Sequence, residues 1–175
     1  TGLAESIKHA LIADEKYFEF LQKNLKDIIA RKTKPLEYIA MKNCQIKAKV
    51  VETDPYEKNM RRVLNYGHTI GHAVESASNY KILHGQAVAI GIIAANIIEQ
   101  KLGLGDSDRL EVLKDIFGKL EMNLNIPKSI TKSQLLDIIS RDKKAVAKWP
   151  KFVLLEKTGK VLRRSGQYAH KVERK

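Results

Sequence analysis

The sequence predicts a mainly α-helical domain with a short β-hairpin near its C-terminus. Apolar residues recur at helical spacing along most of the chain, and the run AVAIGIIAANII at 87–98 is apolar almost throughout. The one strand-like pattern is KFVLLEKTGKVLRR at 151–164. With 175 residues, the chain is long enough for a single domain with its own hydrophobic core.

The first half of the chain predicts three helical segments. Apolar residues recur every three or four positions over 3–25, and this pattern predicts helix. Pro35 is expected to break the chain, and a second helix is predicted over 36–52. The Asp-Pro pair at 54–55 predicts a turn, and a third helix is predicted from about Met60 through the histidine motif.

The second half begins with a buried helix. After a short loop, His84 is expected to open a helix that contains the 87–98 run, and its small apolar residues suit burial on all sides. Asp106 or Ser107 is a candidate N-cap for the next helix. Two amphipathic helices are predicted at 108–121 and 131–141, and a hairpin turn is predicted at Thr158-Gly159.

Composition excludes several classes of protein. The single cysteine, Cys44, can form neither an internal disulfide nor a cysteine-rich metal site. No apolar run reaches the roughly 18 residues of a membrane span, and no signal peptide opens the chain, so a cytoplasmic protein without a membrane partner is expected. The net charge of +12 suits polyanions, but the basic residues are spread along the chain, so no nucleic-acid partner is predicted.

Three of the five histidines, His68, His72 and His84, fall within a short stretch. His68 and His72 are spaced i, i+4, which places both on one helical face. The zinc-protease motif His-Glu-x-x-His is excluded because the Glu is missing. His84 lies at a loop-to-helix junction, where separate elements can converge. A catalytic metal needs about three protein ligands, so a carboxylate from elsewhere is expected to complete the set.

Five motifs follow one another along the chain: GLAESIK at 2–8, IKAKVVETDPYE at 46–57, NYGHTIGHAVE at 65–75, LHGQAVAIG at 83–91 and RDKKAVAKWPKFVLLEKTGK at 141–160. In this order they resemble the motifs of the dehydroquinate synthase family of sugar-phosphate cyclases. The resemblance implies the C-terminal half of a two-domain enzyme. We therefore expect 1–175 to be a single helical domain that binds zinc and the substrate phosphate, and we expect the N-terminal NAD-binding domain to be absent from this chain.

The resemblance also implies residue roles. Zinc, or alternatively cobalt, is implied to bind Glu5, His68 and His84. The substrate pocket is implied to include Lys8, Lys47, Arg61, Asn65, His72, Lys143 and Lys144. Which member of the Lys143–Lys144 pair reaches the substrate stays open. Because Arg61, Asn65, His68 and His72 are spaced by helical turns, we expect one helix to present all four. His9 and His170 match no family position and are expected at the surface.

The implied reaction belongs to the shikimate pathway, which leads to the aromatic amino acids. A lyase of this family converts 3-deoxy-D-arabino-heptulosonate 7-phosphate to 3-dehydroquinate and phosphate, with zinc as Lewis acid and NAD as hydride carrier. NAD is expected to bind mainly to the N-terminal domain, so the chain alone is expected to be inactive, and a homodimer is expected at full length. Gln86 stands where the family usually has Glu, and its neutral amide cannot add negative charge around the metal.

Two alternatives differ in function. One is another sugar-phosphate cyclase, or the metal domain of a polyol or iron-type alcohol dehydrogenase. Glu5 and the Asp-Lys-Lys segment at 142–144 argue against the dehydrogenases, while Arg61, Asn65 and the Lys143–Lys144 pair would discriminate among cyclases. The other is a basic helical nucleic-acid-binding module, which the spread of lysines and the buried 87–98 run argue against.

Overall fold

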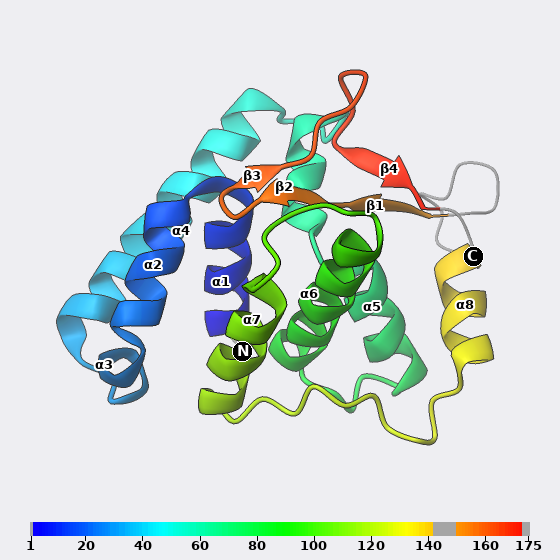
Figure 1. The fold of residues 1–175 in the computed structure, drawn as a ribbon, viewed down its shortest axis with the longest axis horizontal. Coiled ribbons are helices and arrows are strands. Elements are labelled where there is room, and N and C mark those ends of the chain that lie inside the picture. The colour runs from blue at the N-terminus through cyan, green and yellow to red at the C-terminus, as the bar shows by residue number, and fades with distance from the viewer. Residues whose placement is uncertain (1, 142–149, 173–175) are drawn as a thin grey trace.

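The computed structural model describes residues 2–141 and 150–172, and it confirms the predicted fold class. Helices form the body of the molecule, and short strands lie along one side of it (Figure 1). The helices are α1 Gly2–Ala13, α2 Glu15–Lys23, α3 Leu25–Ile29, α4 Thr33–Thr53, the 3-10 helix η1 Met60–Asn65, α5 His68–Ala77, α6 His84–Lys101, α7 Arg109–Lys119 and α8 Lys132–Arg141. The strands are β1 Lys151–Val153, β2 Leu155–Lys157, β3 Lys160–Val161 and β4 Ala169–Lys171.

The first predicted helix is divided into three. Asp14 has an extended backbone (φ −155°), and its carboxylate accepts a hydrogen bond from the backbone N–H of Tyr17, so it ends α1 and caps α2. The prediction for Pro35 is wrong in detail, because this proline lies in the first turn of α4. Proline is tolerated there because the first N–H groups of a helix have no intrahelical partner.

The predicted helix from Met60 through the histidines is also divided, by Gly67. Gly67 has a left-handed backbone (φ 75°), and a Cβ atom there would lie 2.9 Å from the backbone nitrogen of Ile92. The chain therefore forms η1 up to Asn65, turns at Gly67 and starts α5 at His68. The expectation that one helix presents Arg61, Asn65, His68 and His72 is wrong.

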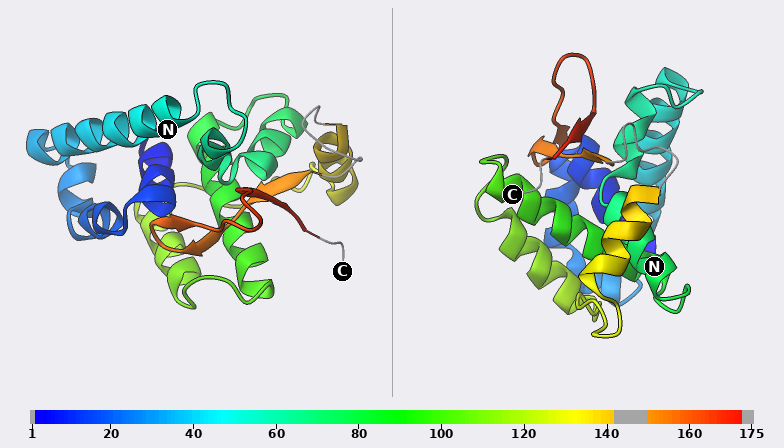
Figure 2. Two further views of the ribbon diagram at one scale, coloured as in Figure 1. Left: turned by 90° about the horizontal axis from the view of Figure 1, so that it is seen from above. Right: turned by 90° about the vertical axis from the view of Figure 1, so that its right-hand side faces the viewer.

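Helix α6 lies at the centre of the fold, with α1, α5 and α7 packed against it (Figures 1 and 2). Its contact with α5 is close, because a methyl group at Gly91 would overlap the carbonyl oxygen of Gly67. Its N-terminal half is buried as predicted, but Ile97 is 40% exposed, so the helix is not buried on all sides. The ring centroids of His68 and His84, the first residues of α5 and α6, lie 5.7 Å apart.

The strands form two antiparallel pairs. The predicted hairpin at Thr158-Gly159 is confirmed as β2 and β3, and the backbone N–H of Gly159 donates to the carbonyl of Leu11, which joins the hairpin to α1. The pairing of β1 with β4 was not predicted; it aligns Phe152 with His170. No helix among the described residues is long and apolar enough to cross a membrane.

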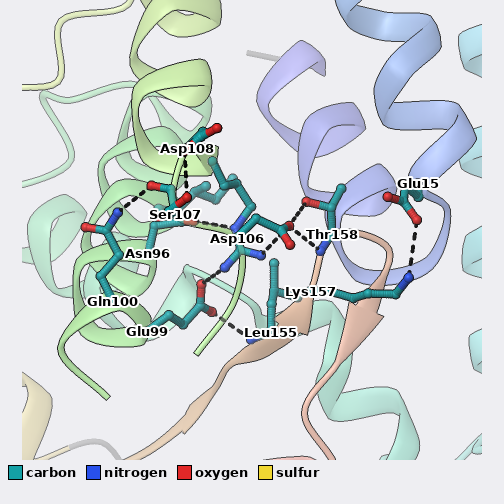
Figure 3. Close-up of polar contacts among 12 residues, drawn as sticks. Glu15, Asn96, Glu99, Gln100, Asp106, Ser107, Asp108, Leu155, Lys157 and Thr158 are labelled. Atoms are coloured by element: carbon teal, nitrogen blue, oxygen red, sulfur yellow. Dashed lines mark hydrogen bonds and ion pairs between the residues drawn. The ribbon is translucent and has the colours of Figure 1, made fainter. Parts of the chain in front are cut away.

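A buried polar network joins α6, α7 and the hairpin (Figure 3). Glu99 accepts hydrogen bonds from the guanidinium of Arg109 at 2.6 Å and from the backbone N–H of Leu155 at 2.7 Å. Arg109 also donates to the side-chain oxygen of Asn96 at 2.6 Å. The side-chain amide of Asn96 donates to the hydroxyl of Tyr66, which connects this network to the segment before His68.

The predicted N-cap of the helix at 108–121 is wrong. Asp108 precedes α7, and its side chain makes no capping hydrogen bond. The carboxylate of Asp106 instead accepts from the backbone N–H and the hydroxyl of Thr158, at 3.1 and 2.9 Å. Asp106 thus holds the loop to the hairpin, a long-range role that local sequence does not reveal.

Candidate metal centre

Glu5, His68 and His84 come together from three helices. Glu5 lies in the first turn of α1, and His68 and His84 are the first residues of α5 and α6. One ligand atom from each residue lies within 4.8 Å of the others. The Glu5 Oε1 atom is 3.5 Å from Nε2 of His68 and 3.6 Å from Nε2 of His84.

The hydrogen bonds of the two imidazoles assign their tautomers. Nδ1 of His68 lies 3.2 Å from the carbonyl oxygen of Tyr66, and Nδ1 of His84 lies 3.0 Å from Oε1 of Glu75. A carbonyl and a carboxylate only accept, so each Nδ1 carries a proton, and in the neutral form of each ring the lone pair then lies on Nε2. Burial, together with the nearby Lys8 charge, lowers the pKa of His68 to about 4, so this imidazole is neutral at pH 7.

The carboxylate of Glu5 supplies the third lone pair. Burial raises its pKa, but the ion pair with Lys8, at 2.7 Å from Oε2, more than offsets this and lowers the pKa overall. The other oxygen, Oε1, is buried without a hydrogen-bond partner among the described residues. Three acceptors therefore face one point without a donor, an arrangement that a cation would satisfy. One carboxylate and two imidazoles suit a catalytic zinc with an open position.

Lys8, Lys47 and His72 border this cluster. The side chain of Lys8 is 4% exposed, and burial lowers its pKa despite the opposing effect of Glu5. Lys47, on α4, is close enough to lower the pKa of Lys8 further. The ring of His72 is exposed and its centroid lies 5.0 Å from that of His68. Positive charge and an exposed imidazole therefore lie beside the three acceptors.

Arg61 and Asn65, which the resemblance assigns to the substrate pocket, bond to the segment between α4 and η1. Arg61 donates to the carbonyl of Pro55 at 2.8 Å, and the amide of Asn65 donates to Glu57 at 3.1 Å, so both bond to the turn before η1. Lys143 and Lys144 fall outside the described residues. The amide of Gln86 donates to the carbonyl of Asn123 at 2.9 Å, which connects α6 to the segment after α7.

The surface position expected for His9 is wrong, whereas His170 is partly exposed. His9 is only 7% exposed and pairs through Nδ1 with the side-chain oxygen of Asn43 at 3.1 Å, because α1 packs against α4. His170 is half-buried on β4, and its Nε2 donates to the carbonyl of Leu162. In both cases a partner distant in sequence satisfies the imidazole.

Sequence reasoning missed Glu75, the partner of His84. A signal was present, because Glu75 lies seven residues after His68 and three after His72, and these spacings place all three on one face of a helix. The acidic end of the motif NYGHTIGHAVE therefore belongs to the same cluster as its histidines.

Comparisons with known proteins give the family and the fold of the chain. Residues 2–145 match the family model described as 3-dehydroquinate synthase C-terminal. The 3-dehydroquinate synthase of Ruminiclostridium cellulolyticum is 39% identical over 160 residues, which cover 91% of this chain and 44% of that protein. The chain thus spans less than half the length of the curated relatives it matches.

Solved structures share the fold. A 2-epi-5-epi-valiolone synthase from Streptomyces hygroscopicus, with NAD+ and Zn2+ bound, superposes with a TM-score of 0.81 at 21% identity, over 92% of this chain and 45% of its own. A 2-deoxy-scyllo-inosose synthase, complexed with carbaglucose-6-phosphate, NAD+ and Co2+, gives 0.77 at 27% identity, over 98% of this chain and 47% of its own. Because the family model matches most of this chain, residues 2–145, the chain belongs to the 3-dehydroquinate synthase family.

Proposed function

We propose that this chain is the C-terminal, metal-binding domain of a 3-dehydroquinate synthase. The whole enzyme would convert 3-deoxy-D-arabino-heptulosonate 7-phosphate to 3-dehydroquinate with loss of phosphate, in the cytoplasm and as a homodimer. The observation that carries the proposal is the convergence of three acceptor atoms, from Glu5, His68 and His84, on one point beside the buried Lys8. An N-terminal domain would bind most of the NAD.

The residues of this chain would bind and orient an anionic sugar phosphate. Zinc held by Glu5, His68 and His84 would supply Lewis-acid polarisation of a substrate hydroxyl, and NAD would accept and return the hydride. Lys8 and Lys47 lie close together and would donate to the negatively charged groups of the substrate as point charges. His72, exposed beside His68, is available to hydrogen-bond the substrate.

Arg61, Asn65, Lys143 and Lys144 complete the proposed pocket. In this structure the guanidinium of Arg61 and the side-chain amide of Asn65 both donate hydrogen bonds to the turn at 54–57. We propose that the substrate phosphate replaces these partners, because a guanidinium binds phosphate more strongly than a backbone carbonyl. The family relationship favours 3-dehydroquinate as product over the products of other cyclases.

We expect the chain to retain about one zinc ion after dialysis, because three zinc-type ligands come from separate helices. Substitution His84→Ala should weaken zinc binding by more than about 100-fold, beyond the loss typical of an outer-shell change. Elemental analysis and chelator competition would measure both quantities. His170→Ala provides the control, since His170 bonds to Leu162 away from the cluster. If the wild-type chain is folded but binds no zinc at any zinc concentration, the proposed metal site is wrong.

A further inference from the structure

We propose that Glu75 is a positioning residue for His84 and the source of outer-shell negative charge at the metal centre. The inference rests on the proposed metal site and extends it to a residue outside the three ligands. Glu75 lies on α5 with a side chain only 12% exposed, and its Oε1 atom lies 3.0 Å from Nδ1 of His84. Its carboxylate therefore joins the α5 face of the cluster to the start of α6.

His84 needs such a partner because packing does not immobilise it. Its side chain is 43% exposed, and it is the first residue of α6, after Leu83, which is 68% exposed. A half-exposed imidazole at a helix start has several accessible rotamers and two neutral tautomers. The hydrogen bond to Glu75 selects the tautomer with the proton on Nδ1, which leaves the Nε2 lone pair facing Glu5.

His68 is held differently, by a neutral group. Its Nδ1 bonds to the backbone carbonyl of Tyr66, whose hydroxyl is fixed by Asn96 and Glu99 in the buried network. Packing and backbone thus position His68, whose side chain is 13% exposed. Of the two imidazoles, only His84 bonds to a carboxylate, so Glu75 affects the two ligands unequally.

The charge of the cluster gives Glu75 a second role. The negative charge of Glu5 is offset by Lys8 at 2.7 Å, so Glu5 and Lys8 together add no net charge to the site. A divalent cation in a partly buried site is stabilised by further negative charge nearby. Gln86, in the first turn of α6, is neutral and bonds to Asn123. The carboxylate of Glu75 is in direct contact with the ligand His84, and it can supply this negative charge.

The experiment separates the hydrogen bond from the charge. Glu75→Gln keeps an acceptor oxygen for Nδ1 but removes the charge, while Glu75→Ala removes both. We expect zinc affinity to fall about 10- to 100-fold in Glu75→Ala, as is typical of an outer-shell partner, and to fall less in Glu75→Gln. Chelator competition on the chain would measure the affinity, with thermal melting as a check of folding. Glu111→Ala is the control for charge, because Glu111 is exposed on α7 and pairs with Lys114.

A second measurement needs no metal. At about pH 8.5, where histidine is neutral, the 15N shifts of the metal-free chain report the tautomer of His84. We expect the Nδ1–H form in the wild type and in Glu75→Gln, and a shift towards the Nε2–H form in Glu75→Ala. Equal zinc affinity in Glu75→Ala and Glu111→Ala would overturn the proposal, as would an unchanged tautomer. If the wild type binds no zinc, the metal site itself fails, whereas the tautomer still decides whether Glu75 positions His84.

Discussion

Replacement of Arg109 by leucine is expected to lower the free energy of unfolding by about 3–5 kcal/mol. The side chain of Arg109 is 3% exposed, and that of its partner Glu99 is fully buried, with 2.6 Å between them. Without the guanidinium, the carboxylate of Glu99 loses its only counter-charge in the network of Figure 3, and the side-chain oxygen of Asn96 loses its donor. Urea denaturation of the chain would measure the loss.

Two further variants make the test specific. Arg164→Leu removes an exposed arginine and should change the free energy of unfolding by less than about 0.5 kcal/mol. The double variant Glu99→Leu with Arg109→Leu should be less destabilised than Arg109→Leu alone, because it leaves no uncompensated charge in the core. Equal denaturation midpoints for Arg109→Leu and Arg164→Leu would show that the buried pair contributes nothing to stability.

The loss in Arg109→Leu should depend on pH through Glu99. Burial raises the pKa of Glu99 from 4.5 to about 7, although Arg109 and the N–H of Leu155 oppose the rise. A raised pKa in the folded state means that the contribution of Glu99 to stability is fully present below pH 4.5 and is lost as pH rises through 7. At pH 5 the carboxyl of the variant is protonated, so the loss of Arg109 should cost less than at pH 8. Urea denaturation at both pH values would measure this. An equal loss of unfolding free energy at pH 5 and pH 8, relative to wild type, would contradict the expected pH dependence.

Local sequence patterns were sufficient for the fold class but not for the break between η1 and α5. The apolar run at 87–98 and the turn at Thr158-Gly159 predicted α6 and the hairpin because the signal lies within each segment. The break at Gly67 depends instead on the approach of Ile92 from α6, which requires a left-handed backbone. Helical spacing continued across this glycine in the sequence, so periodicity alone predicted one helix where tertiary packing made two.

The candidate site was predictable only in part for a similar reason. Helical spacing correctly placed His68 and His72 on one helix, but Glu5, the carboxylate that faces His68 and His84, lies in a separate helix, and only the family resemblance pointed to it. The burial of His9 follows from Asn43, a partner distant in sequence. Glu75 could have been found, since its spacing from His68 and His72 is helical, yet a carboxylate at the end of a helix is ordinarily solvated.

In the proposed full-length enzyme, His68→Ala is expected to reduce turnover at least about 1000-fold, a loss of about 4 kcal/mol in transition-state stabilisation. The reason is that His68 is held by the Tyr66 carbonyl and faces Glu5, so its removal should abolish the proposed Lewis-acid polarisation while leaving Lys8 and Lys47 in place. Phosphate release would measure turnover, and His170→Ala should retain activity close to wild type. The 175-residue chain alone should release no phosphate from the substrate. NAD-dependent turnover by the chain alone would refute the proposed division of the site between two domains. Full activity in His68→Ala would show that the metal takes no part in the reaction.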